Sequence, residues 1–178
     1  DDERPIAMQW IYTKLDNKIL DVAYEISHAK SLSDFKKGAS KLHAPGLNMM
    51  YGDAKNNIAW FASGKLYKYR DSLYTKTYLN GASGNDEILE YLDFKENPQA
   101  VNPSSNYVYS ANNQPDSIAG IMYPGYYLNE DRAKRIVSLL KPKNDWTKED
   151  VAKMIYDVTS PNAPIIAKNL VNSIDKTD

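Results

Sequence analysis

The stretch Val101–Asn113 constrains the fold more than any other part of the sequence, because it places a short apolar segment between two turns. Its first turn contains an Asn-Pro step and two serines; proline restricts the residue before it, and serine bonds to the local backbone. Tyr107–Ala111 is therefore predicted to be a short buried strand, and Asn112 and Asn113 begin the next turn. An asparagine at the mouth of a strand can direct its amide NH₂ at developing negative charge, as an oxyanion hole requires. From the spacing alone, a pair of asparagines that only makes a turn is the favoured interpretation.

Alternation of apolar and polar residues predicts further strands. The segments Asn48–Asp53 and Ile58–Ser63 lie on either side of a short Asn-rich turn, which predicts a hairpin. Ile6–Thr13 is β-branched and aromatic, and it is also predicted to be a strand. After residue 64 the sequence patterns that indicate secondary structure become weaker. We expect a loop over Asn80–Asp86 and a short helical turn over Glu87–Phe94.

Apolar residues at helical spacing predict helices in both halves of the chain. Ser31 and Thr147 each begin a capping-box pattern, in which a side chain accepts a hydrogen bond from the backbone N–H three residues later. The predicted helices, with their inward residues, are Asn17–Ala29 (Ile19, Val22, Ala23, Ile26), Ser31–Leu42, Asn129–Leu140 (Ile136, Val137, Leu140), one from Thr147 (Val151, Met154, Ile155, Val158) and one from Ser160 (Ile166, Leu170, Ile174). Strands and helices together predict a mixed α/β fold, and 178 residues are enough for one domain with a sizeable core.

Composition narrows the function classes. A net charge of −1 offers no basic face for nucleic acid, and no apolar run is long enough to cross a membrane. The absence of cysteine excludes disulfides, thiol nucleophiles and thiolate metal sites. The 14 tyrosines against 3 phenylalanines suit half-buried sheet faces and the walls of binding clefts, and ordinary sheet packing is the favoured explanation.

The sequence resembles the penicillin acylase (penicillin amidase) family of N-terminal nucleophile amidohydrolases in three blocks. Residues 102–113 resemble its signature NP-x-S-G-Y-x-x-x-A-N-N, with Asn106 in place of the glycine. Residues 48–60 resemble its hairpin N-x-x-Y-A-D-x-x-G-N-I-x-W, with Gly52 in place of alanine. Residues 130–136 resemble its helix start A-x-R-x-x-R-I. The blocks occur in the family's order, and the resemblance spans Ile6 to Ser160.

This resemblance implies a fold and two site residues. The fold would be part of an αββα sandwich of antiparallel strands with packed helices, and residues 1–178 would be one fragment of a larger amidohydrolase catalytic domain. Asn112 would donate its side-chain amide to the oxyanion of the tetrahedral intermediate. Arg132 would lie near the nucleophile, orient groups there and depress the pKa of an α-amine. Without the resemblance, Arg132 is better explained as part of a solvated charged helix face.

The nucleophile of the family is a serine that self-cleavage exposes as the first residue of a chain, with its own α-amine as the general base. Asp1 cannot do this chemistry, and the chain contains neither a Gly-x-Ser-x-Gly nor a Ser-x-x-Lys pattern. We therefore expect an internal fragment of the catalytic β chain that is inert by itself. Its partners would be the remaining α chain and the N-terminal part of the β chain, together with a small acyl amide substrate.

No cofactor or metal is predicted. His28 and His43 are isolated from other ligand-type residues. Many relatives hold a structural calcium, but the corresponding stretch is divergent here, with Asp116 the only nearby candidate. The resemblance further implies acylated β-lactams or N-acyl homoserine lactones as substrates, and export to the bacterial periplasm.

A different class of function also remains open. The chain could be a non-catalytic binding or structural module that retains the acylase scaffold, with the Tyr-rich segment Tyr67–Tyr78 contacting a ligand or partner. Carbohydrate recognition by exposed tyrosines is a further hypothesis, and only composition supports it.

Overall fold

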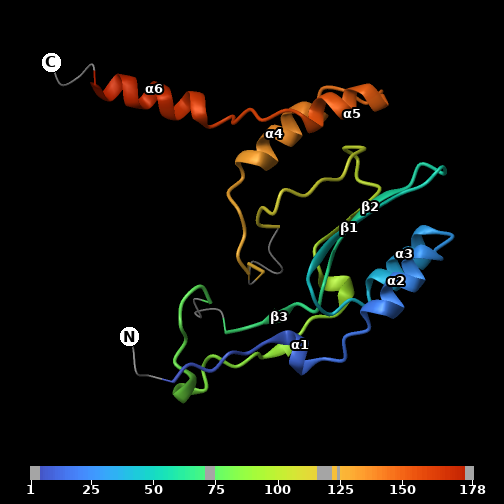
Figure 1. Ribbon diagram of the computed structural model, residues 1–178, viewed down its shortest axis with the longest axis vertical. Helices are drawn as coiled ribbons and strands as arrows, with labels where there is room; N and C mark the ends of the chain where they lie inside the picture. Colours follow the sequence, from blue (N-terminus) through green and yellow to red (C-terminus); the bar gives the residue numbers. More distant parts are fainter. Residues whose placement is uncertain (1–4, 71–74, 116–121, 124, 175–178) are drawn as a thin grey trace. The chain divides into compact units, whose positions relative to one another are not determined.

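The computed structural model describes residues 5–70, 75–115, 122–123 and 125–174 (Figure 1). The chain divides into two compact units. The first comprises residues 1–103 and 115–126, and the second comprises residues 104–114 and 127–178. Within the described ranges every helix or strand belongs to one of these units, and all the strands belong to the first. The expectation that residues 1–178 are one fragment of a single catalytic domain stays a prediction.

An antiparallel sheet with the strand order β1-β2-β5 forms the centre of the first unit. Strand β1 (Leu47–Gly52) pairs with β2 (Ile58–Ser63) along its whole length, and this confirms the predicted hairpin. Strand β5 (Gln99–Val101) lies on the other side of β2 and was missed in the sequence, since three residues are too few for alternation to show. The result is a central strand with a neighbour on each side.

Two helices cover this sheet, α2 (Ile19–Ser27) and α3 (Leu32–Ala39), which contact each other. Ser31 caps α3 as predicted, because its hydroxyl accepts a hydrogen bond from the Asp34 N–H at 3.1 Å. Helix α3 also contacts β1 and β2, so it forms the inner helix of the layer (Figure 1).

The core of the first unit lies between α3 and the sheet. Alternate residues of β2 are buried, and Phe61 is completely so. The Phe35 ring of α3 lies 5.1 Å from the Tyr51 ring and 6.3 Å from the Phe61 ring, and the Phe94 ring lies 5.9 Å from the Phe61 ring. This aromatic cluster anchors the helical layer, since aromatic pairs add to the free energy of simple burial.

A second, two-stranded sheet joins β3 (Tyr67–Lys68) to β4 (Glu90–Tyr91). The Lys68 and Glu90 side chains form an ion pair across it at 2.7 Å. The Tyr67 ring lies 6.4 Å from the Tyr91 ring and 5.2 Å from the Tyr69 ring, and burial raises the pKa of the Tyr67 hydroxyl. The tyrosines at these strands therefore pack on one another. The helical turn predicted over Glu87–Phe94 is wrong, because residues 87–93 contain no helix, β4 lies in the middle of the segment and a 3₁₀ turn begins only at Phe94.

The second unit contains the helices α4 (Asp131–Leu140), α5 (Lys148–Ile155) and α6 (Ala163–Ile174). The predicted capping box of α5 is confirmed: Asp150 N–H donates to the Thr147 hydroxyl at 3.2 Å, and Thr147 N–H donates to the Asp150 carboxylate at 3.1 Å. Helix α6 begins at Ala163, after the Ser160-Pro161 step, and the Ser160 hydroxyl accepts its first N–H at 3.1 Å.

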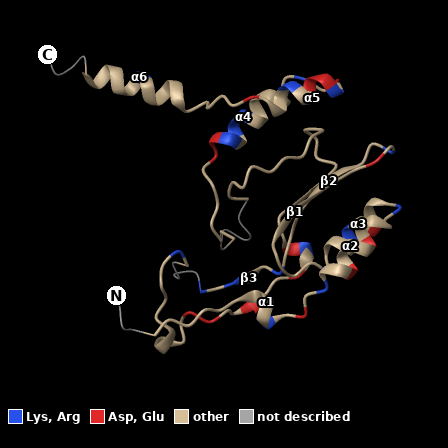
Figure 2. Ribbon diagram, in the orientation of Figure 1, with Lys and Arg blue, Asp and Glu red and all other residues tan. Residues whose placement is uncertain are grey.

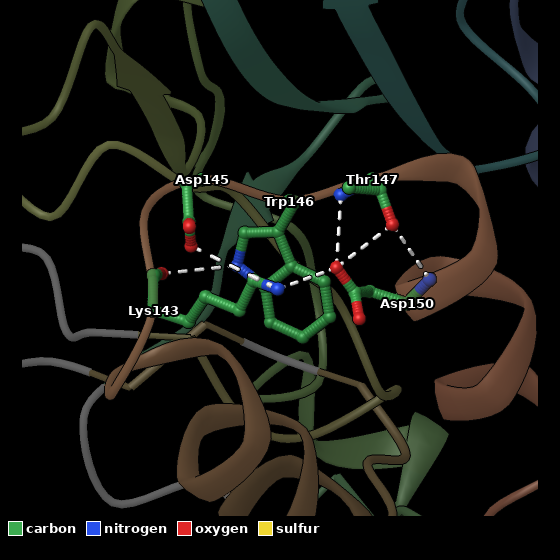
Figure 3. Close-up of polar contacts among 5 residues, drawn as sticks. All are labelled: Lys143, Asp145, Trp146, Thr147 and Asp150. Atoms are coloured by element: carbon green, nitrogen blue, oxygen red, sulfur yellow. Dashed lines mark hydrogen bonds and ion pairs between the residues drawn. The ribbon is translucent and has the colours of Figure 1, made fainter.

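The loop between α4 and α5 is tied to the same capping box (Figure 3). The Lys143 ammonium donates to Asp150 at 2.5 Å, lies 3.8 Å from Asp145 and is 5.8 Å from the centre of the Trp146 ring. Trp146 in turn donates its ring N–H to the Lys143 carbonyl at 3.0 Å. Lys143 lowers the pKa of the Asp150 carboxyl below its ordinary value. One lysine thus fixes the loop and the start of α5 together.

Two of the predicted strands do not form. Ile6–Thr13 gives way to a short helix, α1 (Ile11–Lys14), and residues 5–10 pair with no strand in the described part of the chain. Tyr107–Ala111 likewise joins no sheet there, although Asn113 makes a single parallel bridge to Leu128. Alternation marks a segment that suits a sheet, but a strand forms only where a neighbour supplies its hydrogen bonds.

The inward faces predicted for the last helices are also wrong in this structure. Ile166, Leu170 and Ile174 of α6 are each more than half exposed, and so is Ile155 of α5. Periodicity shows only that these residues share one side of a helix. Whether that side is covered depends on what packs against it.

Candidate functional site

Asn112 stands at a sharp bend of the second unit. Its φ of +59° lies in the left-handed region, which asparagine adopts more readily than other non-glycine residues. The residue before it, Ala111, is completely buried, and the Asn112 carbonyl accepts the Leu128 N–H at 2.7 Å. The backbone is therefore held on both sides of Asn112, while its side chain is exposed.

Arg132 is the second residue of α4, and the structure brings it to Asn112. One terminal nitrogen of the guanidinium donates to the Asn112 Oδ1 at 3.4 Å, a long hydrogen bond between exposed side chains. A guanidinium has only donors, so it must face the oxygen of the amide. The Asn112 NH₂ consequently points away from Arg132, and its two N–H groups stay available to an acceptor outside the pair.

The first turns of α4 are anchored by charged contacts to the segment before α6. The Asp131 carboxylate accepts from the Ser160 hydroxyl at 3.1 Å and from the Asn162 N–H at 3.3 Å. Arg135 makes a two-pronged contact with Asp157, at 2.9 and 2.5 Å, and holds the pKa of that carboxyl at about 2. These contacts fix the helix from which Arg132 projects.

A hollow of about 320 Å³ lies beside this site. It is lined by Tyr109 and Asn113, by Glu130 at the N-cap of α4, and by Ala133, Lys134, Val137 and Ser138 of that helix. The lining residues of α4 recur at intervals of three and four, so they share one helix face, whereas Arg132 lies about 200° around the helix from Glu130. Asn113 therefore contacts a different face of α4 from Asn112, and neither Asn112 nor Arg132 lines the hollow.

Charges of both signs are interspersed on the helices, as Figure 2 shows for α2 and α3 and for α4 and α5. Glu130 and Lys134 pair at 3.3 Å, and Lys41 pairs with Glu25. Arg132 therefore belongs to a helix whose neighbouring charges have partners of their own.

The remaining candidate residues do not gather at this site. His28 bonds to the Tyr24 carbonyl at 2.8 Å, within its own helical turn, and His43 bonds to the Asp16 carbonyl at 2.9 Å, 27 positions away in the chain. Asp116 lies outside the described residues. Among those described, no group of three or more His, Asp or Glu side chains could hold a metal ion. Within the same residues, no helix has the length and apolar character needed to cross a membrane.

Sequence reasoning missed the residues that support the pair. Asp131 was interpreted only as part of a charged helix face and Asp157 was not singled out, because their partners lie 22 or more positions away in the chain. The one local signal was the Ser160-Pro161 step, whose serine hydroxyl donates to the Asp131 carboxylate in addition to capping α6.

Comparisons with known proteins agree with one another. A family model described as penicillin amidase matches residues 1–178. The acyl-homoserine lactone acylase QuiP of Pseudomonas aeruginosa is 26% identical over 147 residues, which are 81% of this chain and 17% of that protein. A solved structure, a thermostable penicillin G acylase from Alcaligenes faecalis, matches with a TM-score of 0.61 and 22% identity over 75% of this chain and 24% of that chain. The chain thus spans less than a quarter of the length of either protein.

The structural match confirms the predicted fold class, helices combined with antiparallel sheets as in a penicillin acylase. The family model covers the whole sequence, and the match to the acylase covers most of this chain. The chain therefore belongs to the penicillin amidase family.

Proposed function

We propose that the protein containing this chain hydrolyses a linear amide by acyl transfer, and that Asn112 stabilises the oxyanion. The observation that carries the proposal is the contact between Arg132 and the Asn112 oxygen, because it leaves the amide N–H groups of Asn112 free to donate. The buried Ala111 and the bond from Leu128 hold the backbone there, as a preorganised donor requires.

The proposed mechanism uses a nucleophile from outside these residues. A serine hydroxyl at the start of a processed chain gives its proton to its own α-amine and attacks the amide carbonyl. Asn112 donates to the resulting oxyanion. The C–N bond then breaks, the α-ammonium returns the proton to the leaving amine, and an acyl-enzyme remains. Water attacks this ester by the same route, releases the acid and restores the serine.

The proposed substrates are N-acylated homoserine lactones and acylated β-lactams. The named activities of the matched acylases, on acyl-homoserine lactone and on penicillin G, support this choice. Both kinds of substrate present a linear amide between an acyl chain and a ring. We also propose a periplasmic location for the whole protein, on family resemblance alone.

The test begins with the full-length protein, by intact mass and N-terminal sequencing of each chain that it yields. We expect a split that leaves a chain beginning with serine, and hydrolysis of an N-acyl homoserine lactone or of penicillin G. Asn112→Ala should then lower kcat by about 10²–10³, the usual effect of losing one oxyanion donor. Asn113→Ala is the matched control, since Asn113 lines the neighbouring hollow, and it should change kcat much less.

The binding-module hypothesis predicts a different result. An uncut protein without a serine, threonine or cysteine at a processing point would contradict the acylase proposal and favour a scaffold without chemistry. The mutual packing of Tyr67, Tyr69 and Tyr91 gives no specific support for a ligand wall in that segment. Catalysis is therefore the proposal that the contacts support best.

A further inference from the structure

Asp131 joins the beginnings of two helices of the second unit. It is the first residue of α4, and its carboxylate accepts hydrogen bonds from the Ser160 hydroxyl at 3.1 Å and from the Asn162 N–H at 3.3 Å. The Ser160 hydroxyl in turn accepts the N–H of Ala163, the first residue of α6, at 3.1 Å. Backbone N–H groups at a helix start have no partner within the helix and need an outside acceptor. The contacts that cap α6 therefore also tie the start of α4 to it.

A second contact of this kind lies one turn farther along α4. Arg135 donates to the Asp157 carboxylate through two nitrogens, and the same carboxylate accepts the Thr159 N–H at 3.0 Å. Asp131 and Arg135 are four positions apart, so they share one face of the helix. Residues 157–162, which we call the anchor segment, thus hold α4 at two points on that face.

The anchored turn of α4 lies next to the two groups that hold Asn112. Leu128, three residues before Asp131, donates its N–H to the Asn112 carbonyl at 2.7 Å. Arg132, the residue after Asp131, donates to the Asn112 Oδ1 at 3.4 Å. The first contact holds the backbone of Asn112, and the second sets the orientation of its amide. All these residues belong to the second unit, and a shift of the anchored turn would displace both donors.

We propose that Asp131 is a positioning residue for Asn112. By tying the start of α4 to the anchor segment, it keeps Leu128 and Arg132 in contact with Asn112 and the amide N–H groups of Asn112 directed away from Arg132. Asp131 itself contacts neither the substrate nor the oxyanion. This inference rests on the proposed function in one respect, namely that Asn112 donates to an oxyanion.

Glu130 supplies a matched control. It is an acidic residue directly before Asp131, and its carboxylate pairs with Lys134 on the same helix at 3.3 Å, with both side chains more than half exposed. Asp131→Ala and Glu130→Ala each remove one carboxylate from the start of α4, and the first also breaks the contacts to the anchor segment. Asp131→Asn is the conservative variant, since its amide oxygen can still accept from Ser160.

The experiment uses the full-length protein, with an N-acyl homoserine lactone and penicillin G as substrates. We expect Asp131→Ala to lower kcat by about 10-fold, since misplacing a catalytic group by 1 Å can cost on the order of 10²-fold and the remaining contact at Arg135 limits the shift. KM should change little. Asp131→Asn should restore most of the lost kcat, and Glu130→Ala should leave both constants nearly unchanged.

Ser160→Ala tests the same contact from its other side. It removes the hydroxyl that donates to Asp131 and leaves the Asn162 N–H in place, so kcat should fall by a smaller factor than in Asp131→Ala. This variant decides the question if Asp131→Ala does not fold. An unchanged kcat in Ser160→Ala together with an unchanged kcat in Asp131→Ala, or in Ser160→Ala alone where Asp131→Ala does not fold, overturns the inference.

A double-mutant cycle separates positioning from general damage to the fold. In an Asn112→Ala background, Asp131→Ala should lower kcat little further, because the group that it positions is absent. An equal loss in both backgrounds, or an equal loss in Glu130→Ala, overturns the inference and leaves the proposed function intact. If Asn112→Ala itself leaves kcat unaltered, the proposed role of Asn112 fails, and the positioning role of Asp131 fails with it.

Discussion

Replacing Asn97 by aspartate changes only the amide nitrogen of its side chain to oxygen, yet we expect a large loss in the free energy of unfolding. Its side chain belongs to a residue only 4% exposed, and its NH₂ donates to the Ala62 carbonyl at 2.9 Å and to the Gly64 carbonyl at 2.8 Å. These bonds tie the segment before β5 to the end of β2. Asn97→Asp keeps the shape of the side chain but replaces both donors with an oxygen that, when ionised, only accepts.

The size of this destabilisation follows from the two states open to the introduced carboxyl, which can take up a proton or stay ionised. Taking up a proton at pH 7, about 3 units above the ordinary pKa of aspartate, costs about 4 kcal/mol, and one donor is still lost at about 1 kcal/mol. Keeping the charge against two carbonyl oxygens costs about 3–5 kcal/mol. We therefore expect a destabilisation of about 4 kcal/mol, against about 2 kcal/mol for Asn97→Ala, which loses two hydrogen bonds of about 1 kcal/mol each.

Amide exchange of the β2 residues in the full-length protein is the suitable assay, since it reports local opening where global unfolding is not two-state. Asn85→Asp is the control for added charge, because Asn85 is exposed. The introduced carboxyl has its pKa raised in the folded state, so the destabilisation of Asn97→Asp should shrink as the pH falls from 7 to 4. A destabilisation no larger than that of Asn97→Ala, or one independent of pH, would refute the reasoning.

Two further predictions concern the second unit. Because Arg135 lowers the pKa of Asp157 to about 2, this carboxylate should stabilise the fold above about pH 4 and lose that effect as the pH falls toward 2. Asp157→Asn should flatten the fall in stability over that range, measured as the urea midpoint at successive pH values, and an unchanged slope would contradict the assignment. Arg132→Ala should lower kcat only about 5-fold, because a hydrogen bond of 3.4 Å between exposed side chains is worth about 1 kcal/mol or less. A loss near that of Asn112→Ala would mean that Arg132 contacts the reacting atoms directly.

Local patterns predicted the elements that depend on nearby residues. The β1–β2 hairpin and the caps at Ser31 and Thr147 each involve groups a few positions apart, so the pattern contains both partners. Local patterns did not identify the site residues. Spacing alone favoured a simple turn at Asn112 and a solvated face at Arg132, and only the family resemblance singled out the pair.

The remaining features depended on contacts between distant parts of the chain. Strand β5 exists because β2 lies beside it, whereas Tyr107–Ala111, with a better strand pattern, pairs with nothing in the described residues. Ile58 bonds to an asparagine 44 positions away, and no local pattern contains that partner.

The sequence by itself therefore determined the family, the fold class, the hairpin and most of the helices, because these follow from periodicity and from motifs in a fixed order. Only the tertiary structure decided which asparagine oxygens face which donors, which apolar faces are covered and which strands are paired. The physical reason is that each of these outcomes is set by a hydrogen-bond or packing partner that the chain brings near only when it folds.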